Sequence, residues 1–308
     1  MSGIKITGWG FSVPEKILTN KDFESMLDTS DNWIVERTGI KERHVGGTNA
    51  TLAYEASIEA LKRRGVEADS VGTLVIATTT PDQTVPATSS HVHELLNMHG
   101  AAFDINAACA GFVYALVVGS QMVNATKKPA LIVGSDVLSK ITDYTDRTTA
   151  VLFGDAAGAL YIEPSESDNL LAFDLGVDGT AKEILYCDHG SYLRMNGKEV
   201  FRRAVRVTVE SAQKVLEEAN LTPEDIALFV PHQANLRIID AVGERLFIPK
   251  EKRAVVVDWT GNTSAASIPV ALAHSANHEK IKPGDLVLLA GFGAGMTWSS
   301  AIVRWGES

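Results

Sequence analysis

The sequence has little cysteine and no obvious targeting segment, and both shortages narrow what the protein can be. Its two cysteines, Cys109 and Cys187, form no CxxC pair, which argues against a disulfide scaffold and a cysteine-rich zinc site. We judge that no apolar stretch approaches the ~20 residues that span a bilayer. The first residues, MSGIKITGWGFSVPEK, lack the apolar core of a signal peptide. We therefore expect a cytoplasmic protein with reduced thiols and no membrane partner.

Basic residues are also scarce relative to acidic ones. The chain has 28 Lys and Arg against 38 Asp and Glu, which gives a net charge of −10. A general nucleic-acid binder is usually basic, so nucleic acid is not an expected partner. The 308 residues, 45% of them hydrophobic, suffice for one large domain or two closely packed halves.

Strand-like and helix-like segments alternate along the chain, which favours an α/β fold. We expect early helices that begin at Thr19 or Asn20 and at Ser30, and another that ends at Gly65. Apolar runs predict buried strands. They lie at 71–80, 103–108, 129–136, 253–261 and within 285–305, and two more are expected within 148–164.

Two distant segments share one plan. FDINAACAGFVYALVV (103–118) and VVDWTGNTSAASIPVAL (256–272) each read as an apolar strand, an Asp, a small-residue turn and a small-residue helix. The echo pairs Cys109 with Asn262. It is loose enough to arise by chance, but if real it implies two similar halves that each deliver one reactive group at a strand-to-helix turn.

Cys109 is the first candidate for chemistry. A free cysteine is most often a small buried hydrophobe. At the start of a helix, however, a thiol lies near the positive end of the helix dipole, which favours the thiolate. The flanking Ala and Gly residues leave room for a substrate, and the backbone N–H groups there could face an oxyanion.

The other candidates are polar groups at similar turns. His232 follows a strand and opens a helix, where it could equally satisfy that helix, and Asn262 could be a simple N-cap. The glycines of GFGAG (291–295) precede a strand rather than a helix, so close backbone approach to a site is favoured over nucleotide binding. His91 and His93 have no further ligand at metal spacing nearby, and we expect no metal site.

Taken together, the motifs resemble those of a known family. AACAGF, PHQANLRI, GNTSAASIP and GFGAGMTW occur in this order, with DNWIVERTGIKERH near the start. The whole chain is similar to 3-oxoacyl-acyl-carrier-protein synthase III. The resemblance implies an α/β thiolase fold of five layers (αβαβα), with two pseudo-symmetric halves at 1–164 and 165–308, in a homodimer.

The resemblance also implies an activity. Cys109 would take an acyl group from acyl-CoA as a thioester. Malonyl-acyl-carrier protein would then lose carbon dioxide, and the resulting carbanion would attack the acyl group. In the family pattern His232 and Asn262 complete the catalytic triad, the backbone N–H groups of Cys109 and Ala294 form the oxyanion hole, and Phe292 lies against the malonyl group. Acyl-CoA is a substrate, and no cofactor is implied.

Further positions match the family's substrate contacts. Trp33 and Arg147 match the pair that sandwiches the adenine, and Arg37 matches a phosphate contact. Phe201, Ala234 and Asn235 match pantetheine contacts. Each also fits a plainer role, as half-buried packing or surface charge.

Docking of the acidic carrier protein to a chain of charge −10 requires a local basic patch. Candidates are the arginines of two predicted helices, Arg202, Arg203 and Arg206 on one and Arg237 and Arg245 on the other. Where the family often has two adjacent basic residues, this chain has Glu244 and Arg245. Val85 matches the position that reaches the partner subunit's acyl pocket, and its small size predicts tolerance of primers longer than acetyl, including branched ones.

Three other readings stay open at this level. A relative from secondary metabolism would condense acyl groups with another acceptor. A non-catalytic thiolase-fold subunit would be expected to lose the nucleophile, which Cys109 retains. A Cys-His hydrolase would need a base to activate water, and the motifs offer no dedicated carboxylate.

Overall fold

The computed structural model describes residues 3–306, which fold around two mixed β-sheets. The first sheet has the order β1-β7-β6-β4-β5 and the second has the order β11-β12-β13-β8. The first is built from β1 (Gly3–Ser12), β4 (Thr73–Ala77), β5 (Ala101–Ile105), β6 (Ala130–Val137) and β7 (Asp155–Ser165). The second is built from β8 (Leu170–Val177), β11 (Leu228–Pro231), β12 (Leu286–Gly293) and β13 (Thr297–Arg304).

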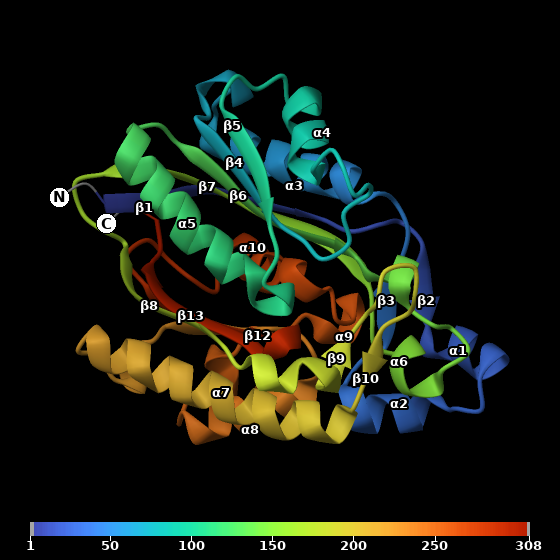
Figure 1. Ribbon diagram of the computed structural model, residues 1–308. Coiled ribbons are helices and arrows are strands. Elements are labelled where there is room, and N and C mark those ends of the chain that lie inside the picture. The colour runs from blue at the N-terminus through green and yellow to red at the C-terminus, as the bar shows by residue number, and fades with distance from the viewer. Residues whose placement is uncertain (1–2, 307–308) are drawn as a thin grey trace.

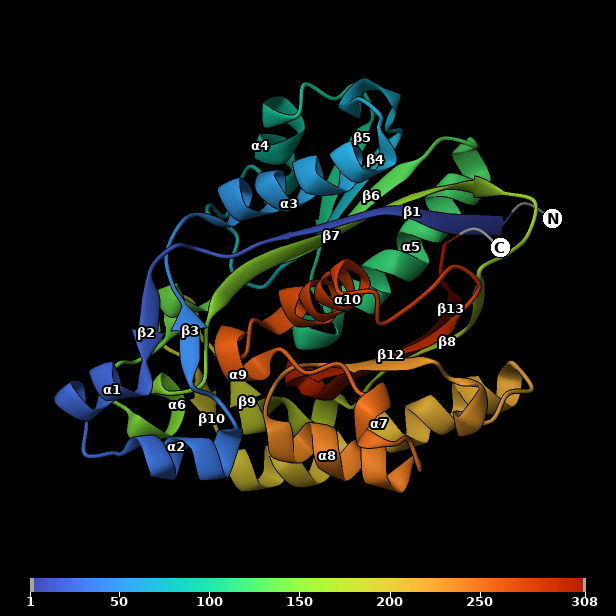
Figure 2. The same cartoon turned by 180° about the vertical axis from the view of Figure 1, so that it is seen from behind.

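Helices form three layers around these sheets (Figure 1). The outer face of the first sheet is covered by α3 (Asn49–Arg64) and α4 (Thr88–Leu95). The two sheets enclose α5 (Gly111–Thr126) and α10 (Ser267–Asn277), and α7 (Gly197–Glu218) and α8 (Leu236–Arg245) cover the second sheet (Figure 2). The predicted five-layer α/β fold is therefore confirmed.

Smaller elements gather at one end of the layers. The helices α1 (Asn20–Met26), α2 (Asp31–Thr38), α6 (Arg147–Ala150) and α9 (Val257–Thr260) lie there with two short antiparallel strand pairs. One pairs β2 (Ile17–Thr19) with β3 (Glu42–His44), and the other pairs β9 (Leu185–Tyr186) with β10 (Arg194–Met195).

The predicted helix ends depend on side-chain caps. Thr19 forms a capping box with Asp22 at the start of α1, and the Ser30 hydroxyl accepts from the Trp33 N–H at the start of α2. Gly39 and Gly65 end α2 and α3 in the left-handed conformation that glycine adopts without strain. The boundaries at Thr19, Ser30 and Gly65 are as predicted.

The estimate that no apolar stretch approaches membrane-spanning length was wrong. Residues Ala108–Thr126 are long and apolar enough to qualify by length and composition. In the fold, this segment is the central helix α5, and its apolar side chains Phe112, Val113 and Leu116 pack in the core between the two sheets. A helix that is apolar on most sides is what a layer between two sheets requires.

Two strand predictions were also wrong. The interval 148–164 holds one strand, β7, because the Asp146 carboxylate accepts from the Thr148 N–H and starts the short helix α6 instead. The interval 253–261 forms no strand beyond an isolated bridge at Arg253. There, the buried side chain of Gln233 binds the Ala254 carbonyl and the N–H groups of Val256 and Val257, and so replaces a strand partner.

Candidate active site

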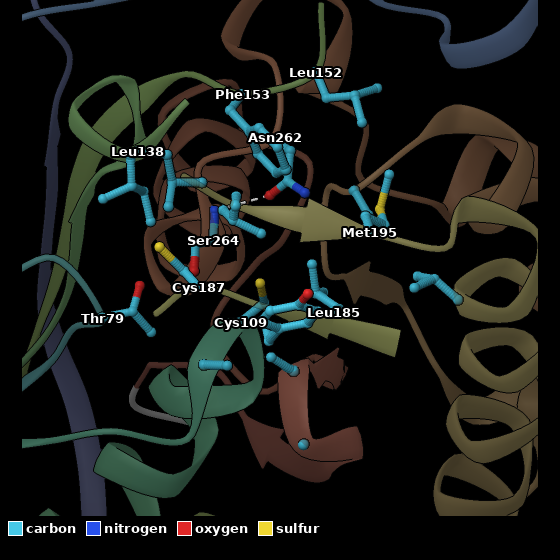
Figure 3. Close-up of a pocket in the computed structure, with 18 of the residues that line it drawn as sticks. Thr79, Cys109, Leu138, Leu152, Phe153, Leu185, Cys187, Met195, Asn262 and Ser264 are labelled. Atoms are coloured by element: carbon cyan, nitrogen blue, oxygen red, sulfur yellow. Dashed lines mark hydrogen bonds between the residues drawn. The ribbon is translucent and has the colours of Figure 1, made fainter. Parts of the chain in front are cut away.

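A cavity of about 1080 Å³ brings the three reactive candidates together. Cys109, His232 and Asn262 all line it, although 153 residues separate the first from the last. Cys109 comes from the turn before α5, His232 follows β11, and Asn262 follows α9. Figure 3 shows Cys109 and Asn262 among the apolar side chains of Leu138, Phe153 and Leu185. Reactive groups and an apolar lining suit an acyl substrate.

The backbone around the thiol is tightly constrained. Cys109 lies in a 3₁₀ turn, Ala108–Ala110, which leads directly into α5. A Cβ placed on Gly293 would lie 2.6 Å from the Cys109 nitrogen, so only glycine lets the GFGAG segment pass this close. The expected close approach of this motif is confirmed, and it carries Ala294 to the wall of the same cavity.

The surroundings of the Cys109 thiol oppose its ionisation. Burial raises the pKa of the Cys109 thiol to about 12; the Ser264 side chain lowers it by hydrogen bonding, and the Asp136 carboxylate raises it further. Desolvation therefore acts against the thiolate that the helix start is expected to favour.

This burial predicts a distinctive pH profile. In a Cys187→Ala background, alkylation of Cys109 by iodoacetamide should rise about tenfold per pH unit from pH 7 to pH 10, since the thiolate is the nucleophile and the thiol pKa is about 12. Rates from intact-protein mass spectrometry test this. A plateau near pH 8, as for a thiol with lowered pKa, would contradict it.

His232 is a neutral, buried imidazole. It is 2% exposed, and burial lowers its pKa to about 3. Its Nδ1 atom lies 2.6 Å from the Ser267 hydroxyl oxygen, and its ring meets the Phe292 ring edge-on with centroids 5.1 Å apart. A neutral imidazole at neutral pH can donate one hydrogen bond from its protonated nitrogen.

Asn262 has one end of its carboxamide committed. Its Oδ1 accepts from the Ser264 N–H at 2.9 Å, which holds a tight turn (Figure 3). The 3₁₀ turn that follows has Thr263 as its N-cap, so Asn262 is not the N-cap that the sequence allowed. The Nδ2 group keeps its two donors for the cavity, since no partner of Nδ2 is found among the described residues.

The predicted echo between the two halves exists, but its pairing was wrong by three residues. Asn106 Oδ1 accepts from the Ala108 N–H just as Asn262 Oδ1 accepts from the Ser264 N–H. Ala108 and Ser264 are both left-handed, at φ of 49° and 52°, and each opens a 3₁₀ turn that leads into a central helix. Asn262 thus corresponds to Asn106 and not to Cys109, so the halves share a turn rather than a reactive position.

Sequence reasoning missed Asp136, which joins the segment after Asn262 to the first sheet. It is fully buried at the end of β6. One oxygen accepts from the Thr79 N–H at 2.7 Å, and the other accepts from the Ala265 N–H at 3.0 Å. The carboxylate therefore fixes the segment that carries Asn262 against the half that carries Cys109. A lone Asp in an apolar strand was the available signal.

The predicted substrate contacts divide into two groups. Phe201, Ala234, Asn235 and Phe292 line the cavity, whereas its lining among the described residues does not include Trp33, Arg37 or Arg147. These last three form a separate stack. The Arg37 and Arg147 guanidinium carbons lie 4.5 Å and 4.9 Å from the Trp33 ring centroid, on α2 and α6.

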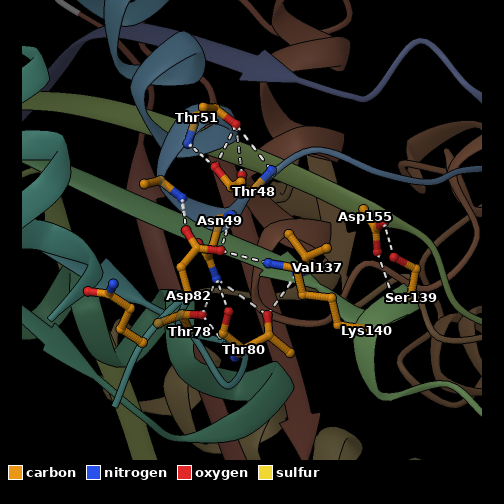
Figure 4. Close-up of polar contacts among 12 residues, drawn as sticks. Thr48, Asn49, Thr51, Thr78, Thr80, Asp82, Val137, Ser139, Lys140 and Asp155 are labelled. Atoms are coloured by element: carbon orange, nitrogen blue, oxygen red, sulfur yellow. Dashed lines mark hydrogen bonds and ion pairs between the residues drawn. The ribbon is translucent and has the colours of Figure 1, made fainter. Parts of the chain in front are cut away.

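Val85 lies outside the cavity lining and is 80% exposed. Asp82, in the same loop, anchors it to neighbouring segments. Its carboxylate accepts from the N–H groups of Asn49 and Ala50 and pairs with Lys140 at 2.7 Å (Figure 4). The Asp82 contacts lower the pKa of that carboxyl despite its partial burial. Val85 therefore lies exposed on a loop that Asp82 holds in place.

The predicted docking arginines differ in how far their charge is neutralised. Arg202 pairs with Glu199 at 2.7 Å, and Arg203 pairs with Asp178 at 3.1 Å. Arg237 lies over the Phe201 ring at 5.7 Å, beside the cavity, while Arg206 and Arg245 are exposed. Within residues 3–306, Arg206, Arg237 and Arg245 form no ion pair with a carboxylate, so their charge is the least neutralised of the five.

No cluster of three or more metal-ligating side chains occurs within residues 3–306. His91 Nε2 contacts the Gln83 amide oxygen at 3.1 Å, and His93 Nε2 contacts the Gly100 carbonyl at 3.0 Å. Both cysteines are free thiols.

Comparison with known proteins agrees with this architecture. The family model described as 3-oxoacyl-[acyl-carrier-protein (ACP)] synthase III matches residues 103–179, and the model of its C-terminal part matches residues 216–305. The beta-ketoacyl-[acyl-carrier-protein] synthase III 1 of Halalkalibacterium halodurans is 49% identical over 313 residues, with 100% of both chains covered.

Solved structures show the same likeness. The 3-oxoacyl-[acyl-carrier-protein] synthase III of Aquifex aeolicus has a TM-score of 0.96 and 42% identity, and the match covers 98% of this chain and 100% of that one. The priming beta-ketosynthase of the R1128 polyketide pathway has a TM-score of 0.94 and 33% identity, with 99% and 97% covered.

Proposed function

The chain belongs to the 3-oxoacyl-[acyl-carrier-protein] synthase III family, and from this membership we propose how its own residues carry out the reaction. It is an acyltransferase that starts fatty-acid synthesis by condensing acyl-CoA with malonyl-acyl-carrier protein. The observation that carries the residue-level proposal is the convergence of Cys109, His232 and Asn262 on one cavity.

In the first half-reaction, Cys109 attacks the acyl-CoA thioester. A new Cys109–acyl thioester forms, the bond from the acyl carbon to the coenzyme sulfur breaks, and the thiol proton leaves on that sulfur. The oxyanion of the tetrahedral intermediate faces the N–H groups of Cys109 and Ala294, whose segments approach closely beside Gly293. Exchange of one thioester for another needs no large input of free energy.

In the second half-reaction, the carbon–carboxylate bond of the malonyl group breaks and carbon dioxide leaves. The electron pair moves toward the thioester oxygen, which becomes negative. Neutral His232 and the Nδ2 group of Asn262 donate hydrogen bonds to this oxygen. The carbanion then attacks the acyl-Cys109 carbonyl, the bond from the acyl carbon to the Cys109 sulfur breaks, and the 3-oxoacyl product forms as the departing thiolate takes up a proton from solvent. Phe292, edge-on to His232, keeps this side of the site apolar.

Acyl-CoA reaches the thiol past two sets of contacts. Phe201, Ala234 and Asn235 on the cavity wall bind the pantetheine arm. Trp33 and Arg147 hold the adenine between them, and Arg37 contacts phosphate. Because Arg147 already stacks on Trp33 at 4.9 Å, it must move outward when an adenine ring enters.

The malonyl substrate arrives on an acidic carrier protein, and Arg237 and Arg245 on α8, with Arg202 on α7, form the docking surface. Arg202 contributes least, since Glu199 neutralises it. A basic surface mainly speeds association and orients the partner.

The chain acts as a cytoplasmic homodimer of two-half protomers, split at 164/165. The first sheet ends at Ser165, one residue beyond this division, and the second uses strands within 170–304. Within the described residues, the outer edge of β5 has no strand partner. The neighbouring helix α4 ends at Leu95, 51% exposed, and Val85 precedes it. An open strand edge beside exposed apolar side chains favours pairing with a second copy.

The steady-state experiment for this function also tests primer range. Purified protein with malonyl-acyl-carrier protein and acetyl-, butyryl- or isobutyryl-CoA should yield the matching 3-oxoacyl-acyl-carrier protein, read by mass spectrometry. We expect the two longer primers to be used, because Val85 leaves more room than an aromatic residue would. Strict selectivity for acetyl-CoA would contradict the primer prediction, and no condensation with any primer would contradict the function.

The similarity to a polyketide priming ketosynthase suggests a second class of acceptor, a polyketide carrier protein. The R1128 priming ketosynthase shares 33% identity and the same fold. Replacing the fatty-acid carrier protein with a polyketide carrier protein in the same assay distinguishes the two, because only the true acceptor should support a high kcat/KM.

A further inference from the structure

The reactive imidazole is held by a hydroxyl from a central helix, α10. Ser267 is the first residue of α10, and its side chain is fully buried. Its Oγ lies 2.6 Å from His232 Nδ1, and the Gln233 N–H donates to the same oxygen at 3.3 Å. Ser267 is absent from the cavity lining, so it touches the imidazole from behind.

The hydrogen-bond partners of the Ser267 hydroxyl determine which ring nitrogen of His232 carries the proton. A serine hydroxyl has one proton to donate and lone pairs to accept with. The Gln233 N–H already uses the oxygen as an acceptor, and the described residues offer the hydroxyl proton no partner other than His232 Nδ1. If Nδ1–H donated to Ser267, the serine proton would be left buried and unpaired, which is unfavourable. The satisfied arrangement has Ser267 donating to Nδ1.

We propose that Ser267 is a positioning residue that keeps the ring proton of His232 on Nε2, the nitrogen that faces the cavity. This inference rests on the proposed role of His232 as a donor to the malonyl thioester oxygen. With the proton on Nε2, the imidazole donates to the oxygen as it becomes negative. With the other tautomer, Nε2 presents a lone pair, which repels that oxygen.

The burial of His232 and the contacts of Gln233 maintain this tautomer of His232. The low pKa of His232 keeps the ring neutral, so only one nitrogen carries a proton. Gln233 is itself immobilised, because its amide nitrogen donates to the Pro231 and Ala254 carbonyls and its amide oxygen accepts from Val256 N–H. The backbone N–H that occupies Ser267 therefore has a fixed position.

The test compares Ser267→Ala with Ser275→Ala in the full-length protein. Ser275 is a buried serine on the same helix, outside the cavity lining, and controls for loss of a hydroxyl from α10. Three quantities are measured: Cys109 acylation by acyl-CoA, carbon dioxide release from malonyl-acyl-carrier protein, and the nitrogen-15 NMR signature of the His232 tautomer, assigned with a His232→Ala sample.

Ser267→Ala should lower decarboxylation about 10- to 100-fold, the range for removing groups that orient a metal-bound histidine. It should leave acylation within about threefold and reduce the Nε2–H signature, while Ser275→Ala changes neither. Unchanged decarboxylation, an equal loss of both half-reactions, or an Nδ1–H signature in the unmodified protein would overturn the proposal. Because the NMR signature needs no turnover, the tautomer is tested even if the proposed function fails.

Discussion

Replacement of Cys109 with alanine is expected to lower the rate of acyl transfer from acyl-CoA by roughly 10³-fold or more. The reason is that the sulfur is the only proposed covalent attachment point. Part of the malonyl decarboxylation should survive, because His232 and Asn262 remain at the cavity wall. Intact-protein mass spectrometry after incubation with labelled acyl-CoA measures the first, and carbon dioxide release measures the second.

The second cysteine supplies a matched control. Cys187 lines the same cavity and is exposed, so it can reach acyl-CoA without being the proposed nucleophile. Cys187→Ala should acylate at the unmodified rate. A stable acyl-protein in Cys109→Ala, or its disappearance in Cys187→Ala, would show that the nucleophile has been assigned to the wrong sulfur.

The second large effect is expected on decarboxylation, when either proposed side-chain donor, His232 or Asn262, is removed. His232→Ala and Asn262→Ala should each slow decarboxylation by roughly 100- to 1000-fold, the usual cost of removing one donor to a developing oxyanion. Acylation of Cys109 should fall much less, because it uses the backbone N–H groups instead. Single-turnover acylation and carbon dioxide release, measured on the same samples, separate the two effects.

Asn262→Asp sharpens this test. Aspartate keeps the oxygen that accepts from the Ser264 N–H and so keeps the turn, but it removes the Nδ2 donor and adds a negative charge. It should slow decarboxylation at least as much as alanine does. If Asn262→Asp were active while Asn262→Ala were not, Asn262 would be a structural cap and not a donor. Equal loss of both half-reactions in the Cys109, His232 and Asn262 variants would contradict the division of labour.

The sequence predicted local structure well where a side chain acts on its own neighbours. The caps at Thr19 and Ser30 and the stop at Gly65 depend on contacts within a few residues. It failed where a distant group intervened. The segment at 253–261 reads as a strand, but the Gln233 side chain satisfies its backbone, and nothing in the segment itself reveals this partner.

The candidate site divides in the same way. The order of the motifs predicted Cys109, His232 and Asn262 as the reactive residues, because residue types and their order can be read directly from the sequence. It showed the helix start that favours the thiolate of Cys109, but not the burial that raises the pKa of the thiol, because that burial depends on remote segments. It also passed over Asp136 and Ser267, whose partners lie 129 and 35 residues away.

By itself, the sequence determined the α/β layering, the helix ends and the inventory of reactive groups, because periodicity, caps and residue chemistry are local properties. Only the tertiary structure decided which reactive groups are desolvated, which two asparagines hold equivalent turns, and which arginines pair with carboxylates. These depend on desolvation and on hydrogen-bond partners brought from remote segments, and both exist only once the two sheets have closed over the central helices.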